Sequence, residues 1–209
     1  MDTLLQQVLR RPDLPKLKVE IEHVLDGEAA RRAAFYDALR DGDRHEFING
    51  ETVMASPARL EHIDCVSGLR DLLSSHVRAN GLGRVIAEQA MVRLTRNDYH
   101  PDVCFWPKDA AEAFTPKQTV FPAPDFIAEV LSDSTAERDR GVKFVDYAAH
   151  GVREYWIVDP AARSVEQYAL DDAGREYRLL RKLDAGRLAS EVVPGFAVDV
   201  AGLFPTAQQ

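Results

Sequence analysis

Residues 125–131, Asp-Phe-Ile-Ala-Glu-Val-Leu, decide the fold. A short run that is apolar at nearly every position predicts a strand buried on both faces of a sheet. Glu129 interrupts this run, and an ionised carboxylate in such a place has to be paired, hydrogen-bonded or bound to a metal ion. Two explanations stay open: a cation site, and a salt bridge to an arginine such as Arg138 or Arg153.

Helices and strands alternate on either side of this strand. Residues 135–150 are expected to form a helix that begins after serine and threonine caps and ends at Gly151, and residues 154–158 form the next apolar strand. The other expected elements are helices over 28–40 and 57–79, strands over 85–94 and 101–106, hairpins over 45–54 and 164–183, a strand before Pro194-Gly195 and a short helix near 203–204. This order predicts an α/β domain, a mixed β-sheet flanked by helices with additional β-hairpins, over residues 28–205. Residues 1–27 are expected to form an N-terminal leader or arm.

The composition is that of an ordinary globular domain. The chain has 209 residues, of which 45% are hydrophobic and 29% are charged. Its two cysteines, Cys65 and Cys104, lack metal-ligand spacing and are expected to be buried free thiols in a reducing compartment. No apolar stretch reaches the roughly 18 residues of a membrane span, and the N-terminus lacks the pattern of a signal peptide. We therefore expect a cytoplasmic protein.

The net charge of −8 argues against general affinity for nucleic acid, because such affinity comes mainly from neutralising phosphates with basic residues. Contact with DNA would then need basic residues gathered on one face, a metal ion or a partner. Basic residues do cluster in and near the C-terminal hairpin: Arg175, Arg178, Arg181, Lys182 and Arg187, with Arg138, Arg140 and Arg153. They form either an electropositive face or the ordinary charged outer face of a hairpin.

Two further residues have side chains suited to act with Glu129. Asp102 enters the apolar strand 101–106, where its carboxylate needs a partner; alternatively it caps a turn at the entry of the strand. Lys143 lies in the helix 135–150, at the edge of the stripe expected to be buried; alternatively it is a solvated flank. That stripe consists of Val142, Val145 and Ala149.

These three side chains suit phosphodiester cleavage, which needs a hard cation to polarise the phosphate and to lower the pKa of the attacking water. Asp102 and Glu129 on adjacent strands, aided by the backbone carbonyl of Val130, would hold Mg²⁺ or Mn²⁺. Lys143 would position the water and offset charge on the phosphoryl oxygens. A Pro-Asp, an acidic residue 27 positions later and then a lysine is the pattern that PD-(D/E)XK nucleases share.

The sequence surrounding these residues is more specific than their spacing. Residues 123–132 are followed by Ser134-Thr135, Arg138-Asp139-Arg140-Gly141, Lys143, Tyr147 and the stretch 151–160. This block resembles the Uma2 (DUF820) family, and residues 45–51, Glu61-His62 and 194–196 resemble further landmarks of that family. The resemblance covers about residues 28–205. It implies a restriction-endonuclease-like core with a metal site on Asp102 and Glu129.

Two positions depart from the family pattern. Leu131 stands two residues after Glu129, where the PD-(D/E)XK pattern has lysine, and the resemblance implies that Lys143 takes over its role. Asp133 stands where relatives often carry proline; its charge favours the start of the following helix but would repel an approaching phosphate.

Glu51 and His62 are further candidates. Glu51 would complete the metal shell or orient water, and His62 would act as a general base. The alternatives are a surface glutamate of a hairpin and a histidine on a helix flank.

The sequence therefore predicts a Mg²⁺-dependent endonuclease that hydrolyses DNA, in the form of a homodimer because two sites suit the cutting of two strands. The alternative is a catalytically inactive nuclease fold that acts as a binding or regulatory module, which the acidic charge and the displaced lysine favour. The glycines and cysteines lack the spacing of a dinucleotide-binding site, a P-loop or a zinc site.

Overall fold

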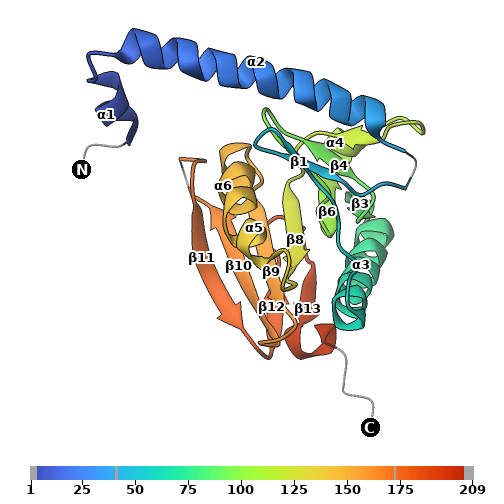
Figure 1. Ribbon diagram of the computed structural model, residues 1–209. Helices are drawn as coiled ribbons and strands as arrows, with labels where there is room; N and C mark the ends of the chain where they lie inside the picture. Colours follow the sequence, from blue (N-terminus) through green and yellow to red (C-terminus); the bar gives the residue numbers. More distant parts are fainter. Residues whose placement is uncertain (1–3, 41, 172, 205–209) are drawn as a thin grey trace.

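A mixed six-stranded sheet lies at the centre of the computed structural model, which describes residues 4–40, 42–171 and 173–204 (Figure 1). In sheet order its strands are β11 (Tyr177–Leu183), β10 (Ser164–Leu170), β9 (Glu154–Asp159), β8 (Phe126–Val130), β6 (Val103–Pro107) and β3 (Gly83–Ala87). β8 and β9 run parallel, and the other neighbouring strands run antiparallel. The apolar run that begins at Phe126 is thus an interior strand of the sheet, as predicted.

The two faces of this sheet follow from the alternation of side chains along its strands. One face, which carries Phe105 and Ala128, packs against α3 (Leu60–Asn80) and the C-terminal elements. These are β12 (Arg187–Ala189), β13 (Ala197–Asp199) and the 3-10 helix η1 (Val200–Leu203). The other face, which carries Cys104 and Ile127, packs against α6 (Val142–Ala149) and a second sheet. Glu129 lies on this second face, two residues from Ile127.

The second sheet has five short strands in the order β2-β1-β5-β4-β7. They are β2 (Glu51–Val53), β1 (Glu46–Ile48), β5 (Asp98–Tyr99), β4 (Met91–Arg93) and β7 (Val120–Phe121), and the short helix α4 (Lys108–Ala111) follows β6. The predicted hairpin turn at Asn49-Gly50 is confirmed, with φ of 50° and 86° at the two residues.

A long helix, α2 (Leu14–Ala38), crosses the top of the molecule (Figure 1). Its C-terminal half packs on the five-stranded sheet through Phe35, which contacts the Phe47 ring. Its N-terminal half and α1 (Leu4–Leu9) project beyond the body. The predicted helix start at residue 28 is therefore wrong, because the helix begins at Leu14 and accommodates the following proline in its first turn. No helix in the described part of the chain is long and apolar enough to cross a membrane.

Two expected elements are each divided in two. Residues 85–94 do not form one strand: the chain leaves β3 at Glu88, whose φ of 56° is left-handed, and enters β4 in the other sheet. The helix expected over 135–150 is interrupted at Gly141, which separates α5 (Ala136–Arg140) from α6. A side chain at Gly141 would come within 2.6 Å of the Glu137 carbonyl oxygen, so the break needs glycine.

The break at Gly141 changes which face of the helix is buried. The buried side chains of α6 are Lys143, Tyr147 and Ala148, whereas Val145 is 67% exposed. The predicted buried stripe of Val142, Val145 and Ala149 is therefore wrong, because α6 starts afresh after the break and presents its other side to the sheet.

Several other predictions are confirmed. α3 ends at Gly81 in the left-handed conformation, the hairpin of β10 and β11 spans the predicted region, and Cys65 and Cys104 are buried free thiols. The predicted strand before Pro194-Gly195 is β12. The strand β13, which follows Pro194-Gly195 and pairs with β12, was not predicted.

Candidate active site

Glu129 lies at the centre of the candidate site and is 2% exposed. Its Oε1 accepts hydrogen bonds from Lys143 Nζ at 3.0 Å and from the Tyr147 hydroxyl at 2.8 Å, and its Oε2 accepts one from the Asp102 backbone N–H at 3.2 Å. The alternative of a salt bridge from Glu129 to Arg153 is wrong, because Arg153 pairs with Asp125 at 3.1 Å. The ion-pair partner of Glu129 is Lys143.

Asp102 lies in a bend immediately before β6, so its predicted place on that strand is wrong. Its Oδ2 accepts a hydrogen bond from the Val130 backbone N–H at 2.7 Å, and its Oδ1 lies 3.5 Å from His62 Nε2. Asp102 and Glu129 thus lie close together at the end of β8, joined through two backbone N–H groups.

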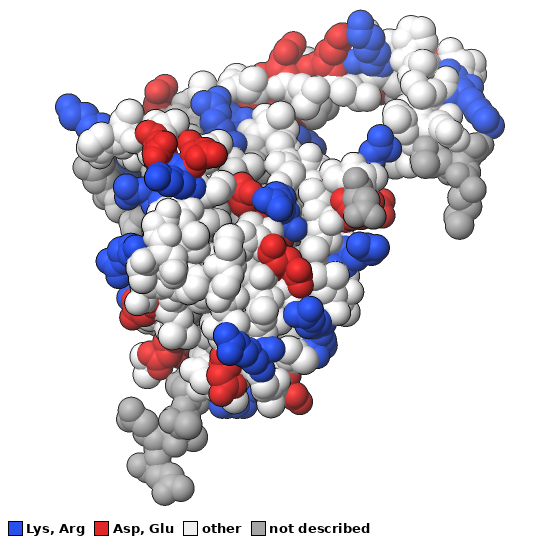
Figure 2. All heavy atoms as spheres, turned by 180° about the vertical axis from the view of Figure 1, so that it is seen from behind, with Lys and Arg blue, Asp and Glu red and all other residues white. Residues whose placement is uncertain are grey.

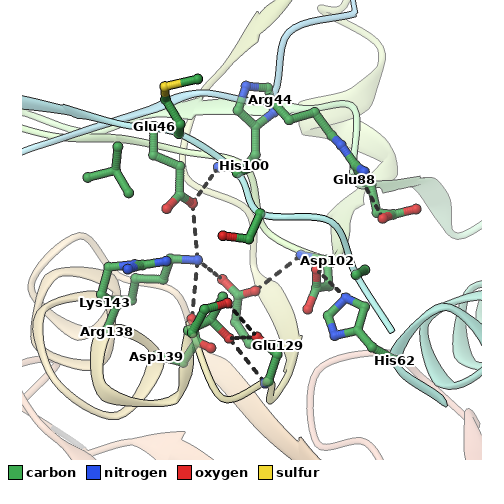
Figure 3. A pocket seen from close by; sticks show the side chains of 18 of the residues that line it. Arg44, Glu46, His62, Glu88, His100, Asp102, Glu129, Arg138, Asp139 and Lys143 are labelled. Atoms are coloured by element: carbon green, nitrogen blue, oxygen red, sulfur yellow. Dashed lines mark hydrogen bonds and ion pairs between the residues drawn. The ribbon is translucent and has the colours of Figure 1, made fainter. Parts of the chain in front are cut away.

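Lys143 is 5% exposed, which excludes the solvated flank considered above. Its ammonium lies 3.1 Å from Glu46 Oε1, 3.0 Å from Glu129 Oε1 and 3.2 Å from Asp139 Oδ1 (Figure 3). Glu46 and Asp139 were not predicted. Asp139 could have been found from its i, i+4 spacing to Lys143, but Glu46 comes from the other sheet and has no such signal.

Burial and charge act together on these groups. Burial, with repulsion from neighbouring carboxylates, raises the pKa of Glu129 well above its usual range, and burial likewise raises that of Asp139. Burial would lower the pKa of Lys143, but the surrounding carboxylates outweigh it and raise that pKa. Burial also opposes protonation of His62, yet its hydrogen bond to Asp102 and that charge raise its pKa overall.

These residues line a pocket of about 100 Å³ at the junction of the two sheets and α5 (Figure 3). Several polar atoms of its wall are buried and have no hydrogen-bond partner in the described part of the chain: His62 Nδ1, both ring nitrogens of His100, and Arg138 Nε. Buried polar atoms normally have partners, so unpaired ones gathered around one cavity point to a bound ligand or water.

The remaining candidates have different positions. His62 is buried in the pocket wall, whereas Glu51 is exposed on β2 and does not line the pocket. Asp133 is exposed and forms an ion pair with Arg59 at 2.6 Å. Their chain neighbours Ala58, Ser132 and Ser134 line the pocket.

Four of the eight basic residues considered for an electropositive face, among them Arg153 described above, form ion pairs with acidic side chains. Arg140 and Lys182 both pair with Glu166, at 2.7 and 2.9 Å, and Arg181 pairs with Glu191 at 3.4 Å. The back of the molecule likewise shows basic and acidic side chains interspersed (Figure 2).

The fold is an α/β architecture that a solved structure shares. A solved structure described as "a putative nuclease belonging to DUF820 from Anabaena variabilis ATCC 29413" matches this chain with a TM-score of 0.69. The match covers 81% of this chain and 94% of that one at 18% sequence identity, and at this identity it shows a shared fold.

The family follows from the sequence. The family model of Uma2, described as "Putative restriction endonuclease", matches residues 32–201, and the chain belongs to this family. A comparison with curated proteins found no match. The predicted family and the predicted fold class are thereby confirmed.

Proposed function

We propose that this chain is a divalent-cation-dependent endonuclease that hydrolyses DNA phosphodiester bonds in the pocket of Asp102, Glu129 and Lys143. The observation that carries the proposal is the meeting of two carboxylates from neighbouring chain segments with a buried lysine in one pocket. The description of the Uma2 family supports a nuclease.

The residues of the pocket fit Mg²⁺ or Mn²⁺. Asp102 Oδ1 retains acceptor capacity, because its contact is His62 Nε2 at 3.5 Å. Glu129 Oε2 also retains acceptor capacity, because it accepts one backbone hydrogen bond. Mg²⁺ is bound through one or two carboxylates and keeps several waters, so these two oxygens with the Val130 carbonyl suffice. Among the described residues no group of three acidic, histidine or cysteine side chains is already arranged around a metal position. When bound, the cation would polarise the phosphate and lower the pKa of a bound water.

The protein side chains would bind and orient the phosphate around that position. Lys143 is held by three carboxylates, so its charge is fixed beside Glu129 and can offset charge on a phosphoryl oxygen. His62 has a raised pKa and an unpaired Nδ1, which suits a proton donor or a phosphate contact better than a general base. Glu51 has no part in this proposal, since it lies outside the pocket.

One observation favours the alternative of a binding module without catalysis. The ammonium of Lys143 already lies among Glu46, Glu129 and Asp139, so an internal cation neutralises part of the negative charge that would attract a metal ion. The two functions differ in a measurable way, because the binding module needs no divalent cation.

We further propose that the protein acts in the cytoplasm as a homodimer on DNA. Two copies supply two sites for the two strands, and the buried thiols Cys65 and Cys104 suit a reducing compartment.

Calorimetric titration with Mg²⁺ and Mn²⁺, together with relaxation of supercoiled plasmid, tests the proposal. We expect cation binding and cleavage in the wild type and in the control Glu51→Gln, and loss of both in Asp102→Asn and Glu129→Gln. Cleavage that survives either site substitution contradicts the site. A wild type that binds neither cation contradicts the nuclease function and supports the binding module.

A further inference from the structure

Exposed apolar side chains are concentrated in the N-terminal arm, defined as residues 4–25. Seven of the fourteen large apolar side chains that are exposed in the described part of the chain lie in this arm: Leu4, Leu5, Leu9, Val19, Ile21, Val24 and Leu25. Soluble monomers seldom expose contiguous apolar patches beyond a few hundred Å², so this concentration points to an interaction surface.

The apolar side of the arm continues the side of α2 that faces the body. Leu14, Ile21, Glu28 and Phe35 are seven residues apart and therefore share one helix face. Glu28 and Phe35 are buried against the body, whereas Ile21 is 53% exposed. This helix face is therefore buried in the C-terminal half of α2 and exposed in its N-terminal half, where α2 extends beyond the body. Figure 2 shows an open notch between the arm and the body.

A groove of about 560 Å³ lies at the inner end of this notch, between α2 and the five-stranded sheet. Its apolar lining consists of Leu25, Ala29, Ala33, Tyr36 and Phe47, and the rest of its lining is polar or charged: Glu28, Arg32, Arg93, Thr95 and Arg96. Leu25 belongs both to the arm and to the groove and so joins the two surfaces.

We propose that this surface binds a second copy of the chain by exchange of arms, so that each arm lies beneath the other and each α1 reaches the groove of its partner. Without Val19, which lies on the opposite side of the helix, the exposed apolar side chains of the arm offer roughly 350 Å² per copy, taking about 100 Å² for a fully exposed aliphatic side chain. A standard interface buries about 800 Å² per partner, and about 65% of a homodimer interface is apolar. The arm therefore supplies about two thirds of the roughly 520 Å² of apolar area that such an interface buries per partner, and the apolar part of the groove adds to it. A projecting helix without packing is also only marginally stable in water.

The two helices run antiparallel in this arrangement. From Glu28 onward the shared face of α2 is covered by its own body, so a partner helix running in the same direction would collide with that body. In an antiparallel pair, the N-terminal end of the partner's α2 lies where α2 of the first copy meets its own body. Leu14 of one copy then lies near Val24 of the other, and α1 of one copy lies beside Leu25 and the groove of the other.

This inference is independent of the nuclease proposal, because the arm lies outside the part of the chain that matches Uma2, residues 32–201. It gives the proposed dimer a physical basis.

Light scattering coupled to size exclusion tests the interface on the full chain. We expect the wild type to have twice the mass of one chain and Ile21→Glu/Val24→Glu to have the mass of one chain. Val19→Glu is the matched control, since Val19 is similarly exposed (63%) but lies on the opposite side of the helix, and it should remain dimeric. A monomeric wild type at high micromolar concentration, or a dimer that persists in the double variant, overturns the proposal.

Cross-linking gives a second measurement that does not depend on the folding of the glutamate variants. Cys65 and Cys104 are fully buried, so an introduced surface cysteine is the reactive one. Oxidation of a mixture of Leu14→Cys and Val24→Cys should give mixed cross-linked dimers in preference to dimers of either variant alone. Cross-links only between two copies of Leu14→Cys would contradict the antiparallel exchange.

Discussion

Two buried glutamates on adjacent strands, Glu129 on β8 and Glu154 on β9, have opposite surroundings. Glu154 is fully buried and accepts hydrogen bonds from uncharged donors only: Trp156 Nε1 at 2.6 Å, Gln167 Nε2 at 2.7 Å, Ser190 Oγ at 2.6 Å, and the backbone N–H groups of Glu191 and Val192 at 3.0 and 2.9 Å. Glu129 instead shares its surroundings with three other carboxylates, a lysine and a pocket.

The comparison shows that burial of a strand carboxylate does not by itself indicate function. Glu154 joins β9 to β10 and to the turn at residues 190–193, and its lone pairs are used in doing so. Glu129 retains acceptor capacity and faces unpaired polar atoms. The difference lies in whether the hydrogen bonds of the carboxylate are completed by the fold or left for a ligand.

Glu154→Ala should have the largest effect on stability. It leaves five donors without this acceptor, two of them fully buried and three partly buried, and we expect a loss of about 3–5 kcal/mol in the free energy of unfolding. Urea unfolding measures it, with exposed Glu191→Ala as the control that changes by less than about 0.5 kcal/mol. A loss below about 1 kcal/mol would show that the hydrogen bonds of Glu154 are not needed by the fold.

Lys143→Met should cost about 3 kcal/mol, because it leaves Glu46, Glu129 and Asp139 without their shared counter-charge. Mg²⁺ should then raise the melting temperature of Lys143→Met more than that of the wild type, since a bound cation replaces the lost charge. Lys182→Met, whose ammonium is half exposed on Glu166, is the control and should respond to Mg²⁺ as the wild type does. An equal response of Lys143→Met and the wild type would contradict a cation position beside Glu129.

Glu166 is an intermediate case, a buried carboxylate paired with cations at the surface. Hydrogen bonds from Arg140 lower the pKa of Glu166, and hydrogen bonds from Tyr168 and Lys182 lower it further. Burial acts in the opposite direction, and the resulting pKa is about 2. The folded state therefore holds this proton less tightly than the unfolded chain, so the stabilisation is present above the unfolded pKa of 4.5 and is lost as the pH falls toward 2.

Glu166→Gln should accordingly lower the free energy of unfolding by about 1–2 kcal/mol at neutral pH, allowing for solvent screening of Arg140 and Lys182. The difference from the wild type should shrink as unfolding is measured at pH 4 and then pH 3. A difference that is constant with pH would exclude the lowered pKa as its cause.

The strand pattern made the position of Glu129 predictable, but it did not predict which residues surround Glu129 in the pocket. Period-two alternation correctly places its side chain on one face of an interior strand, and the helix and strand that follow come from equally strong local patterns. Glu46 reaches the pocket from a three-residue strand of the other sheet, and no local spacing joins it to Lys143. The burial of Lys143 depends on the break at Gly141, where a glycine inside a helical pattern changes the direction of all later side chains.

Glu154 shows the same limit from the other side. It also belongs to an apolar strand, as the first residue of β9, yet most of its partners come from residues 167 and 190–192, farther along the chain. Sequence alone therefore could not separate the carboxylate that belongs to a pocket from the one that belongs to the fold.

Glu129→Gln should have the smallest effect on stability, in contrast to Glu154→Ala. The amide oxygen keeps an acceptor for Lys143 and Tyr147, whereas the amide nitrogen can no longer accept the hydrogen bond from the Asp102 N–H. Removal of one of several mutually repelling charges offsets that loss, so the free energy of unfolding should change by less than about 1 kcal/mol at neutral pH. Because the pKa of Glu129 is raised in the folded state, its contribution to stability falls as the pH rises above the unfolded value of 4.5. Glu129→Gln should therefore become more stable relative to the wild type from pH 4 to pH 7 in urea unfolding, while losing cation binding. A loss of several kcal/mol, as expected for Glu154→Ala, would mean that Glu129 is a structural carboxylate and that the two sites do not differ in kind.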